Sequence, residues 1–113
     1  RDPLKRSQLY LLFADKHMGM GQSLWDGKQY GLATATFIQG EKYLLTSATT
    51  LVFPRNENKL PPGVAEKVGL SAKKHEEILN KLHAISGTEK EKMQLTEALG
   101  MTYQAMQQVA SLK

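Results

Sequence analysis

The sequence contains no cysteine, and this absence removes several kinds of chemistry. Without a thiol the chain can form no disulfide, hold no thiolate-bound zinc ion and use no cysteine nucleophile. Aromatic residues are also scarce, with one Trp, four Tyr and three Phe among 113 residues. A nucleic-acid groove needs basic residues on one side, interleaved with aromatic rings. We therefore expect no nucleic-acid partner.

Long apolar runs are missing as well. The longest one, Leu9 to Ala14, is far shorter than the roughly 20 apolar residues that cross a bilayer, so it indicates the core face of a helix. The chain begins with Arg1 rather than methionine, which suggests a cut piece or a processed product. Membrane attachment through a missing upstream segment therefore remains open.

Composition predicts one domain over residues 1–113, because 41% hydrophobic and 23% charged residues are typical of a soluble chain with a single core. The net charge of +4 is a modest basic excess. In the second half of the chain lysines and glutamates alternate, which favours solvated helix faces over a basic binding surface. These residues are Lys67, Lys73, Lys74, Lys81, Lys90 and Lys92 with Glu66, Glu76, Glu77, Glu89 and Glu91.

A helix over 30–53 is the strongest pattern in the sequence. Its small and apolar residues recur in steps of three and four, as one helix face requires, at Ala33, Phe37, Gly40, Leu44, Ala48 and Leu51. We expect this helix to be the central strut, and we expect Gly40 to lie at a close crossing in the core with either the first or the last of the four predicted helices. Pro54 disfavours helical backbone in the residue before it, so the helix should end at Phe53.

Three further helices are predicted, near 3–26, 63–86 and 88–112, with a linker over 54–62. Asp2 followed by Pro3 starts the first helix, and Thr88 with Glu91 forms a capping box for the last. Gly69 could kink the third helix, or Ser71 could cap its main body. The expected core stripe of the 3–26 helix is Leu9, Phe13, Lys16 or His17, Met20 and Leu24, widened by Leu12. That of the 63–86 helix is Val64, Val68, Ser71, His75, Ile78, Leu82 and Ile85. That of the 88–112 helix is Leu95, Leu99, Thr102, Met106 and Val109, widened by Ala98, Met101, Ala105 and Leu112.

Short connections at 27–29 and 87 predict antiparallel neighbours, so the expected fold is all-α: an antiparallel up-down four-helix bundle built from two helix hairpins. Gly19 and Gly21 lie inside the first predicted helix, where each costs about 1 kcal/mol. We expect both to be retained because a neighbouring backbone comes close.

No catalytic, cofactor-binding or metal-binding residues are predicted. His75 and His83 are eight residues apart rather than at the four-residue spacing typical of zinc sites, and with His17 they complete the histidines. His75 sits where its stripe needs an apolar residue, so we expect it to be at least half-buried and bonded to a hydroxyl or carbonyl. The candidate partners are Thr46, Ser47, Thr50 and Tyr103, and a neutral buried imidazole would weaken the fold below about pH 6.

Two resemblances add to this interpretation. Met20, Gly21 and Leu24, followed by Tyr30, Ala33, Phe37 and Gly40, resemble a single tetratricopeptide-like helix hairpin with one residue inserted at the turn. Only one such hairpin is visible, whereas a peptide-binding superhelix needs at least three repeats.

A longer resemblance covers most of the chain, through RDPLKRSQLYLLFADKHMGMGQ, WDGKQYGLATATFIQGEKYLL and LPPGVAEKVGLSAKKHEEIL. These segments are similar to an uncharacterised bacterial helical domain, a domain of unknown function found in predicted exported or membrane-anchored proteins. The resemblance implies a helical fold and an extracytoplasmic or membrane-anchored location, and it carries over no site.

Three functions remain open. The leading one is a non-catalytic helical module for protein–protein interaction or structure, part of a larger extracytoplasmic protein. A small-molecule or lipid-binding bundle would instead show a closed apolar cavity of about 300 Å³ or more. An enzyme or metal protein would show polar groups converging in a pocket. The partner's identity and the oligomeric state are left open.

Overall fold

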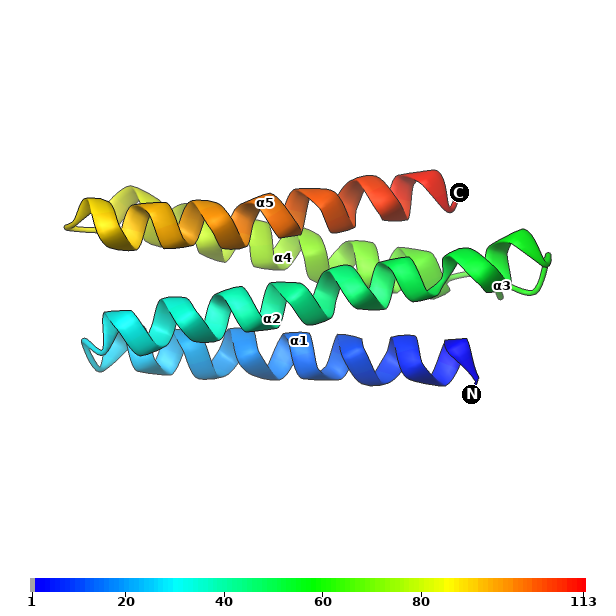
Figure 1. Cartoon of the computed structure of the whole chain (residues 1–113), viewed down its shortest axis with the longest axis horizontal. Coiled ribbons are helices and arrows are strands. Elements are labelled where there is room, and N and C mark those ends of the chain that lie inside the picture. Colours follow the sequence, from blue (N-terminus) through cyan, green and yellow to red (C-terminus); the bar gives the residue numbers. More distant parts are fainter. Residues whose placement is uncertain (1) are drawn as a thin grey trace.

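The structure is a computed structural model, and it describes residues 2–113. Within this range every regular element is a helix: α1 (Pro3–Asp26), α2 (Tyr30–Thr50), α3 (Val52–Asn56), α4 (Val64–Ile85) and α5 (Glu89–Ser111). The four long helices pack side by side in a body of 47 × 21 × 17 Å (Figure 1). The predicted all-α class and the packing of four helices are confirmed.

Two helix starts form as the sequence predicts. The Asp2 carboxylate accepts a hydrogen bond of 2.9 Å from the backbone N–H of Leu4, and Pro3 occupies the first helical position of α1. At α5 the Thr88 hydroxyl oxygen accepts a 3.2 Å bond from the N–H of Glu91, and the hydroxyl donates to the Glu91 carboxylate. The two bonds from backbone N–H groups satisfy amides that have no partner within their own helix.

The end of α2 differs from the prediction. Instead of continuing to Phe53, α2 stops at Thr50, and the short helix α3 begins at Val52. Pro54 lies inside α3 and is buried. A proline is tolerated in a first turn because the N–H groups there have no helical acceptor, so Pro54 does not break the helix. The irregular connection is therefore 57–63 rather than 54–62.

The start of α4 depends on Gly63, whose φ of +88° is in the left-handed region. From Val64 the helix is continuous to Ile85, so no new start at Ser71 divides it. Gly69 instead allows a close contact with α5: a Cβ added there would lie 3.2 Å from Val109 Cγ1.

The central helix of the bundle is α2. It packs extensively against α1 on one side and against α5 on the other, whereas α4 packs mainly against α5. The contact of α4 with α1 is slight, and we call the boundary between these two helices the α1/α4 seam. In Figure 1 the chain termini lie toward one end of the body and the 27–29 and 86–88 connections lie at the other.

The core of α2 follows the predicted stripe completely, and all six of its residues are buried. In α5 the residues Leu95, Leu99, Thr102 and Val109 are buried as predicted, and Met106 is partly buried. In α4 the prediction holds only in part, since Ser71, Ile78 and Leu82 are partly buried and Ile85 is exposed. The buried residues of α4 include more small side chains than predicted: they are Ala65, Val68, Ala72, His75 and Leu79.

The predicted core stripe of α1 is right only in part: Phe13, His17 and Leu24 are partly buried, but the other predicted residues are exposed. The structure exposes Leu9 by 48%, Leu12 by 49% and Met20 by 51%, and buries a stripe one or two residues away: Ser7, Leu11, Ala14, Met18, Gly21 and Trp25. The buried stripe is richer in small residues, which let α1 approach α2 closely. Both faces of α1 carry large apolar residues, so hydrophobic spacing alone chose the wrong one.

Three contacts show how closely α1 and α2 approach. A Cβ added at Gly40 would lie 2.8 Å from His17 Cβ, which confirms that Gly40 is at a close crossing with α1. A Cβ at Gly21 would lie 2.3 Å from the ring of Phe37, so the close neighbour there is a side chain rather than backbone. A Cβ added at Gly19 would meet no atom of a neighbouring element within 4 Å, so the expectation of a close backbone is wrong for this position.

Candidate functional site: a buried histidine–carboxylate cluster

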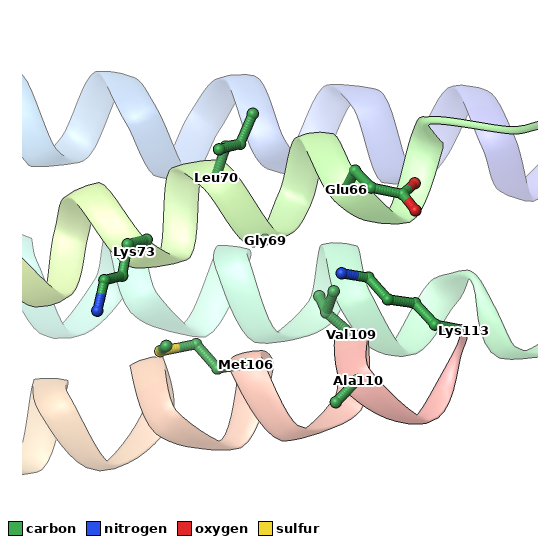
Figure 2. A pocket seen from close by; sticks show the side chains of 8 residues that line it. All are labelled: Glu66, Gly69, Leu70, Lys73, Met106, Val109, Ala110 and Lys113. Atoms are coloured by element: carbon green, nitrogen blue, oxygen red, sulfur yellow. The ribbon is translucent and has the colours of Figure 1, made fainter.

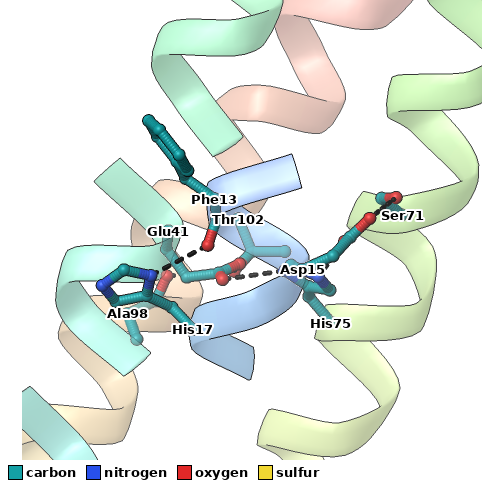
Figure 3. Close-up of polar contacts among 8 residues, drawn as sticks. All are labelled: Phe13, Asp15, His17, Glu41, Ser71, His75, Ala98 and Thr102. Carbon is teal, nitrogen blue, oxygen red and sulfur yellow. Dashed lines mark hydrogen bonds and ion pairs between the residues drawn. The ribbon is translucent and has the colours of Figure 1, made fainter. Parts of the chain in front are cut away.

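Each long helix contributes one polar side chain, from near the middle of its length, to a single cluster. Figure 3 shows the contacts within this cluster. The cluster comprises Asp15 of α1, Glu41 of α2, His75 of α4 and Thr102 of α5. Glu41 and Thr102 are 0% exposed and His75 is 2% exposed, whereas the Asp15 side chain is 49% exposed. The cluster therefore runs from the core to the surface at the α1/α4 seam.

His75 lies between the two carboxylates. Its Nδ1 is 2.8 Å from Glu41 Oε2, and its Nε2 is 2.9 Å from Asp15 Oδ1. An ionised carboxylate has no hydrogen to donate, so between two ionised carboxylates both ring nitrogens donate, whereas a neutral imidazole has a single N–H. The geometry therefore fits a protonated imidazolium that bridges α2 and α1 through charge-assisted hydrogen bonds.

The remaining oxygens of both carboxylates are also bonded. The Thr102 hydroxyl donates to Glu41 Oε1 at 2.7 Å and has the Ala98 carbonyl as a second acceptor at 3.0 Å. The Ser71 hydroxyl donates to Asp15 Oδ2 at 3.3 Å. Among residues 2–113, no buried side-chain nitrogen or oxygen lacks a partner. Such complete bonding is the condition under which a core tolerates charged groups.

The surroundings of His75 act on its pKa in opposite directions. Burial lowers the pKa, since it disfavours the charged ring, but the hydrogen bonds and negative charges of Glu41 and Asp15 outweigh it. The net effect raises the pKa of His75 above its usual value of 6.5. The cluster thus favours the doubly protonated ring that its geometry requires.

The sequence-based prediction for His75 is right in one respect and wrong in two. Its burial is confirmed. Its partners are Glu41 and Asp15 rather than Thr46, Ser47, Thr50 or Tyr103. The expected weakening of the fold by acid assumed a neutral ring; because the pKa is raised, protonation of His75 stabilises the fold instead.

Sequence reasoning missed Glu41 and Asp15. A signal for Glu41 was present, because it continues a second run of three- and four-residue steps through α2: Thr34, Phe37, Glu41, Leu44, Ala48 and Leu51, all of them buried. A carboxylate on such a stripe needs a partner in the core. Asp15 lies at the edge of the buried face of α1 and had no comparable signal.

The other histidines lie apart from the cluster. His17 Nδ1–H donates to the Phe13 carbonyl at 2.9 Å, and its ring packs edge-on against Tyr43 with centroids 5.2 Å apart. His83 is partly exposed near the end of α4. Within the described part of the chain, no group of three or more histidine and acidic side chains is arranged to hold a metal ion.

Five open hollows lie on the surface of the described residues, and none of these five is lined by Glu41, His75 or Thr102. One of these hollows, of about 420 Å³, lies between α4 and α5. Figure 2 shows its lining residues, which are Glu66, Gly69, Leu70, Lys73, Met106, Val109, Ala110 and Lys113. Another, of about 570 Å³, borders Asp15 on the outer side of α1. The buried part of the cluster thus lines none of the five.

Comparison of the chain with protein-family models, with curated proteins and with solved structures gives no match. Over residues 2–113, no helix combines the length and the apolar character needed to cross a membrane.

Proposed function

We propose that this chain is a non-catalytic helical module, in which the buried cluster fixes the relative positions of four helices and the outer surface of α1 contacts a partner. The observation that carries the proposal is that the cluster uses its hydrogen-bonding groups internally. Both ring nitrogens of His75 and all four carboxylate oxygens of Glu41 and Asp15 have partners within the protein.

This arrangement favours a structural role over catalysis. A general base needs a free nitrogen or oxygen within reach of a substrate proton. In the cluster both His75 nitrogens donate to carboxylates, and Glu41 is completely buried. The cluster also links all four long helices through one polar residue from each. If one helix shifted along another, at least one of these hydrogen bonds would break, so the cluster can fix the helix positions.

The finer description of the fold belongs to this proposal. We propose an antiparallel up-down arrangement of two hairpins, α1 with α2 and α4 with α5, supported by extensive packing within both pairs and by their short connections. We also propose that residues 1–113 form a single domain and that this domain is part of a larger extracytoplasmic or membrane-anchored bacterial protein. Kinship with the uncharacterised domain family is part of the same proposal.

The alternative function, a small-molecule or lipid-binding bundle, would require a closed apolar cavity. The five hollows described above are open to solvent. The exposed apolar residues of α1 favour a surface contact instead, since Leu9, Leu12 and Met20 are each about half exposed.

Site-specific photo-crosslinking in the host cell tests the proposal. A photoreactive residue at Leu9 or Leu12 of the full-length gene product should give a reproducible crosslink to one class of molecule. The same group at Thr96, which is exposed on α5, provides the control. The proposal fails if positions on α1 crosslink no more than Thr96, or if a His75 variant that keeps its fold loses a chemical activity of the parent.

A further inference from the structure

The outer face of α1 carries a continuous stripe that we call the outer stripe, in steps of three and four residues: Lys5, Leu9, Leu12, Lys16, Met20 and Leu24. Five of these residues are exposed, and Leu24 is partly buried. The stripe spans 20 residues of one helix, or roughly 30 Å at about 1.5 Å per residue. It thus forms a long convex ridge with apolar and basic side chains.

The outer stripe contains no carboxylate. Three acidic residues lie in α1 or cap it, and each lies off the stripe: Asp2 caps the helix, Asp26 is its last residue, and Asp15 binds His75 and Ser71 of α4. The ridge therefore carries two lysines, and the carboxylate beside them, Asp15, is half exposed but already bonded to His75 and Ser71.

The neighbouring edge of α4 extends the basic character. Ser71 bonds to Asp15, so Ser71 lies at the α1/α4 seam, and Lys67 and Lys74 lie one turn before and one turn after it on the same side. Both lysines line an open hollow of about 390 Å³ with Leu70, which is 72% exposed. One carboxylate, that of Glu77, borders the same hollow.

Gly19 adds an apolar notch beside the outer stripe. With no atom of another element within 4 Å of a Cβ built at this residue, the glycine leaves open a hollow of about 570 Å³. Met20 and Leu24 line its apolar part, and Asp15, Lys16 and Ser23 border it as well. Nothing inside the described molecule requires a glycine here. The space beside Gly19 can therefore accommodate an apolar chain of another molecule along the surface of α1.

We propose that the outer stripe of α1, with Lys67, Leu70 and Lys74 of α4, binds the surface of an anionic lipid membrane. Leucine and methionine side chains enter the boundary between head groups and acyl chains, while the lysines contact the anionic head groups. The inference rests on the proposed function, for which it names the partner.

Charge and shape favour a membrane over other occupants. A second copy of the chain would bring its own lysines against Lys5 and Lys16, and the carboxylate beside the stripe, Asp15, is already bonded to His75 and Ser71. A protein partner would need a groove about as long as the ridge. A bilayer surface deforms around a convex ridge and supplies anionic groups above an apolar layer, so it matches both features.

Vesicle co-sedimentation tests the proposal. The chain should bind vesicles of equimolar phosphatidylcholine and phosphatidylglycerol, bind vesicles of pure phosphatidylcholine at least about tenfold more weakly, and lose affinity as salt is added. Each of Lys16→Gln and Lys74→Gln should weaken binding about fivefold. The double variant Leu9→Gln, Leu12→Gln should weaken it about tenfold or more.

Met93→Gln is the matched control, because Met93 is 70% exposed on α5, away from the outer stripe. Its binding should equal that of the parent, and circular dichroism should show the parent's helix content in every variant. The proposal is overturned if the parent ignores anionic vesicles, or if Met93→Gln weakens binding as much as the variants on α1.

Two other outcomes also reject the membrane while leaving the proposed function intact. In the first, Leu12 crosslinks to a protein in cells and the chain does not bind anionic vesicles. In the second, the chain forms a dimer in solution that Leu12→Gln dissociates. Absence of any specific crosslink from α1 would instead reject the proposed function itself.

Discussion

At the residue scale, the protonated state of His75 has a measurable consequence. Because its pKa is raised in the folded chain, the ring contributes stability that is fully present below its usual pKa of 6.5. This contribution is lost as pH rises through the folded pKa. We expect the free energy of unfolding to fall over this interval, measured by urea denaturation in steps from about pH 6 upward.

NMR titration of the three histidines checks the same prediction directly. The His75 ring should titrate with a midpoint above 6.5, and its two N–H protons should exchange slowly because the residue is buried. His83→Gln is a suitable control, since it removes a histidine of the same helix outside the cluster. A His75 midpoint below 6.5 would contradict the prediction and restore the neutral ring expected from sequence.

Gly19 and Gly21 form a matched pair in one helix. Gly19→Ala should stabilise the fold by about 0.5 to 1 kcal/mol, because the added Cβ meets no atom within 4 Å and alanine favours helix. Gly21→Ala should destabilise it by about 1 to 3 kcal/mol, because its Cβ would lie 2.3 Å from the Phe37 ring. Thermal unfolding of both variants checks this. Equal shifts would mean that α1 does not pack in this register.

At the scale of the elements, the close crossing of α1 and α2 is the tightest constraint. Gly40→Leu should destabilise the fold by about 1 to 3 kcal/mol despite its better helix propensity, because the Cβ would lie 2.8 Å from His17 Cβ. His17 Cβ is fixed to the α1 backbone and cannot rotate away. Gly100→Leu is the control, since Gly100 has no neighbour within 4 Å. A melting temperature that rises for Gly40→Leu would disprove the crossing.

The elements also show what periodicity can predict. The stripe of α2 was predicted correctly because all its residues from Ala33 to Ala48 lie on the surface that packs between two neighbouring helices. The stripe of α1 was not, because Leu9 and Leu12 form a second apolar face that the structure leaves exposed. Spacing identifies faces but cannot rank two of them, since the choice depends on which face fits α2.

At the scale of the whole molecule, the cluster could be predicted only in part. His75 and Thr102 lie on stripes that demand burial, so their positions in the core followed from sequence. Their pairing did not, because Glu41 and Asp15 are separated from His75 by 34 and 60 positions. The packing of four helices brings these residues together, and no local sequence pattern predicts which residues so far apart in the chain will form a pair.

The last prediction concerns the cluster as a unit. His75→Leu alone should cost about 3 to 5 kcal/mol, because it leaves the buried Glu41 carboxylate with Thr102 as its one partner. Glu41→Leu alone should cost about as much, because it leaves a buried ring N–H without an acceptor. The double variant should cost much less than the sum, since Thr102 keeps the Ala98 carbonyl and the exposed side of Asp15 keeps water. Urea denaturation of the four proteins gives the coupling energy, and additive costs would contradict a coupled pair.

NMR of the double variant then separates stability from specificity: if the cluster fixes the helix register, an apolar replacement should remain folded but show broadened or multiple signals for residues of α4, the helix that the cluster ties to α1 and α2.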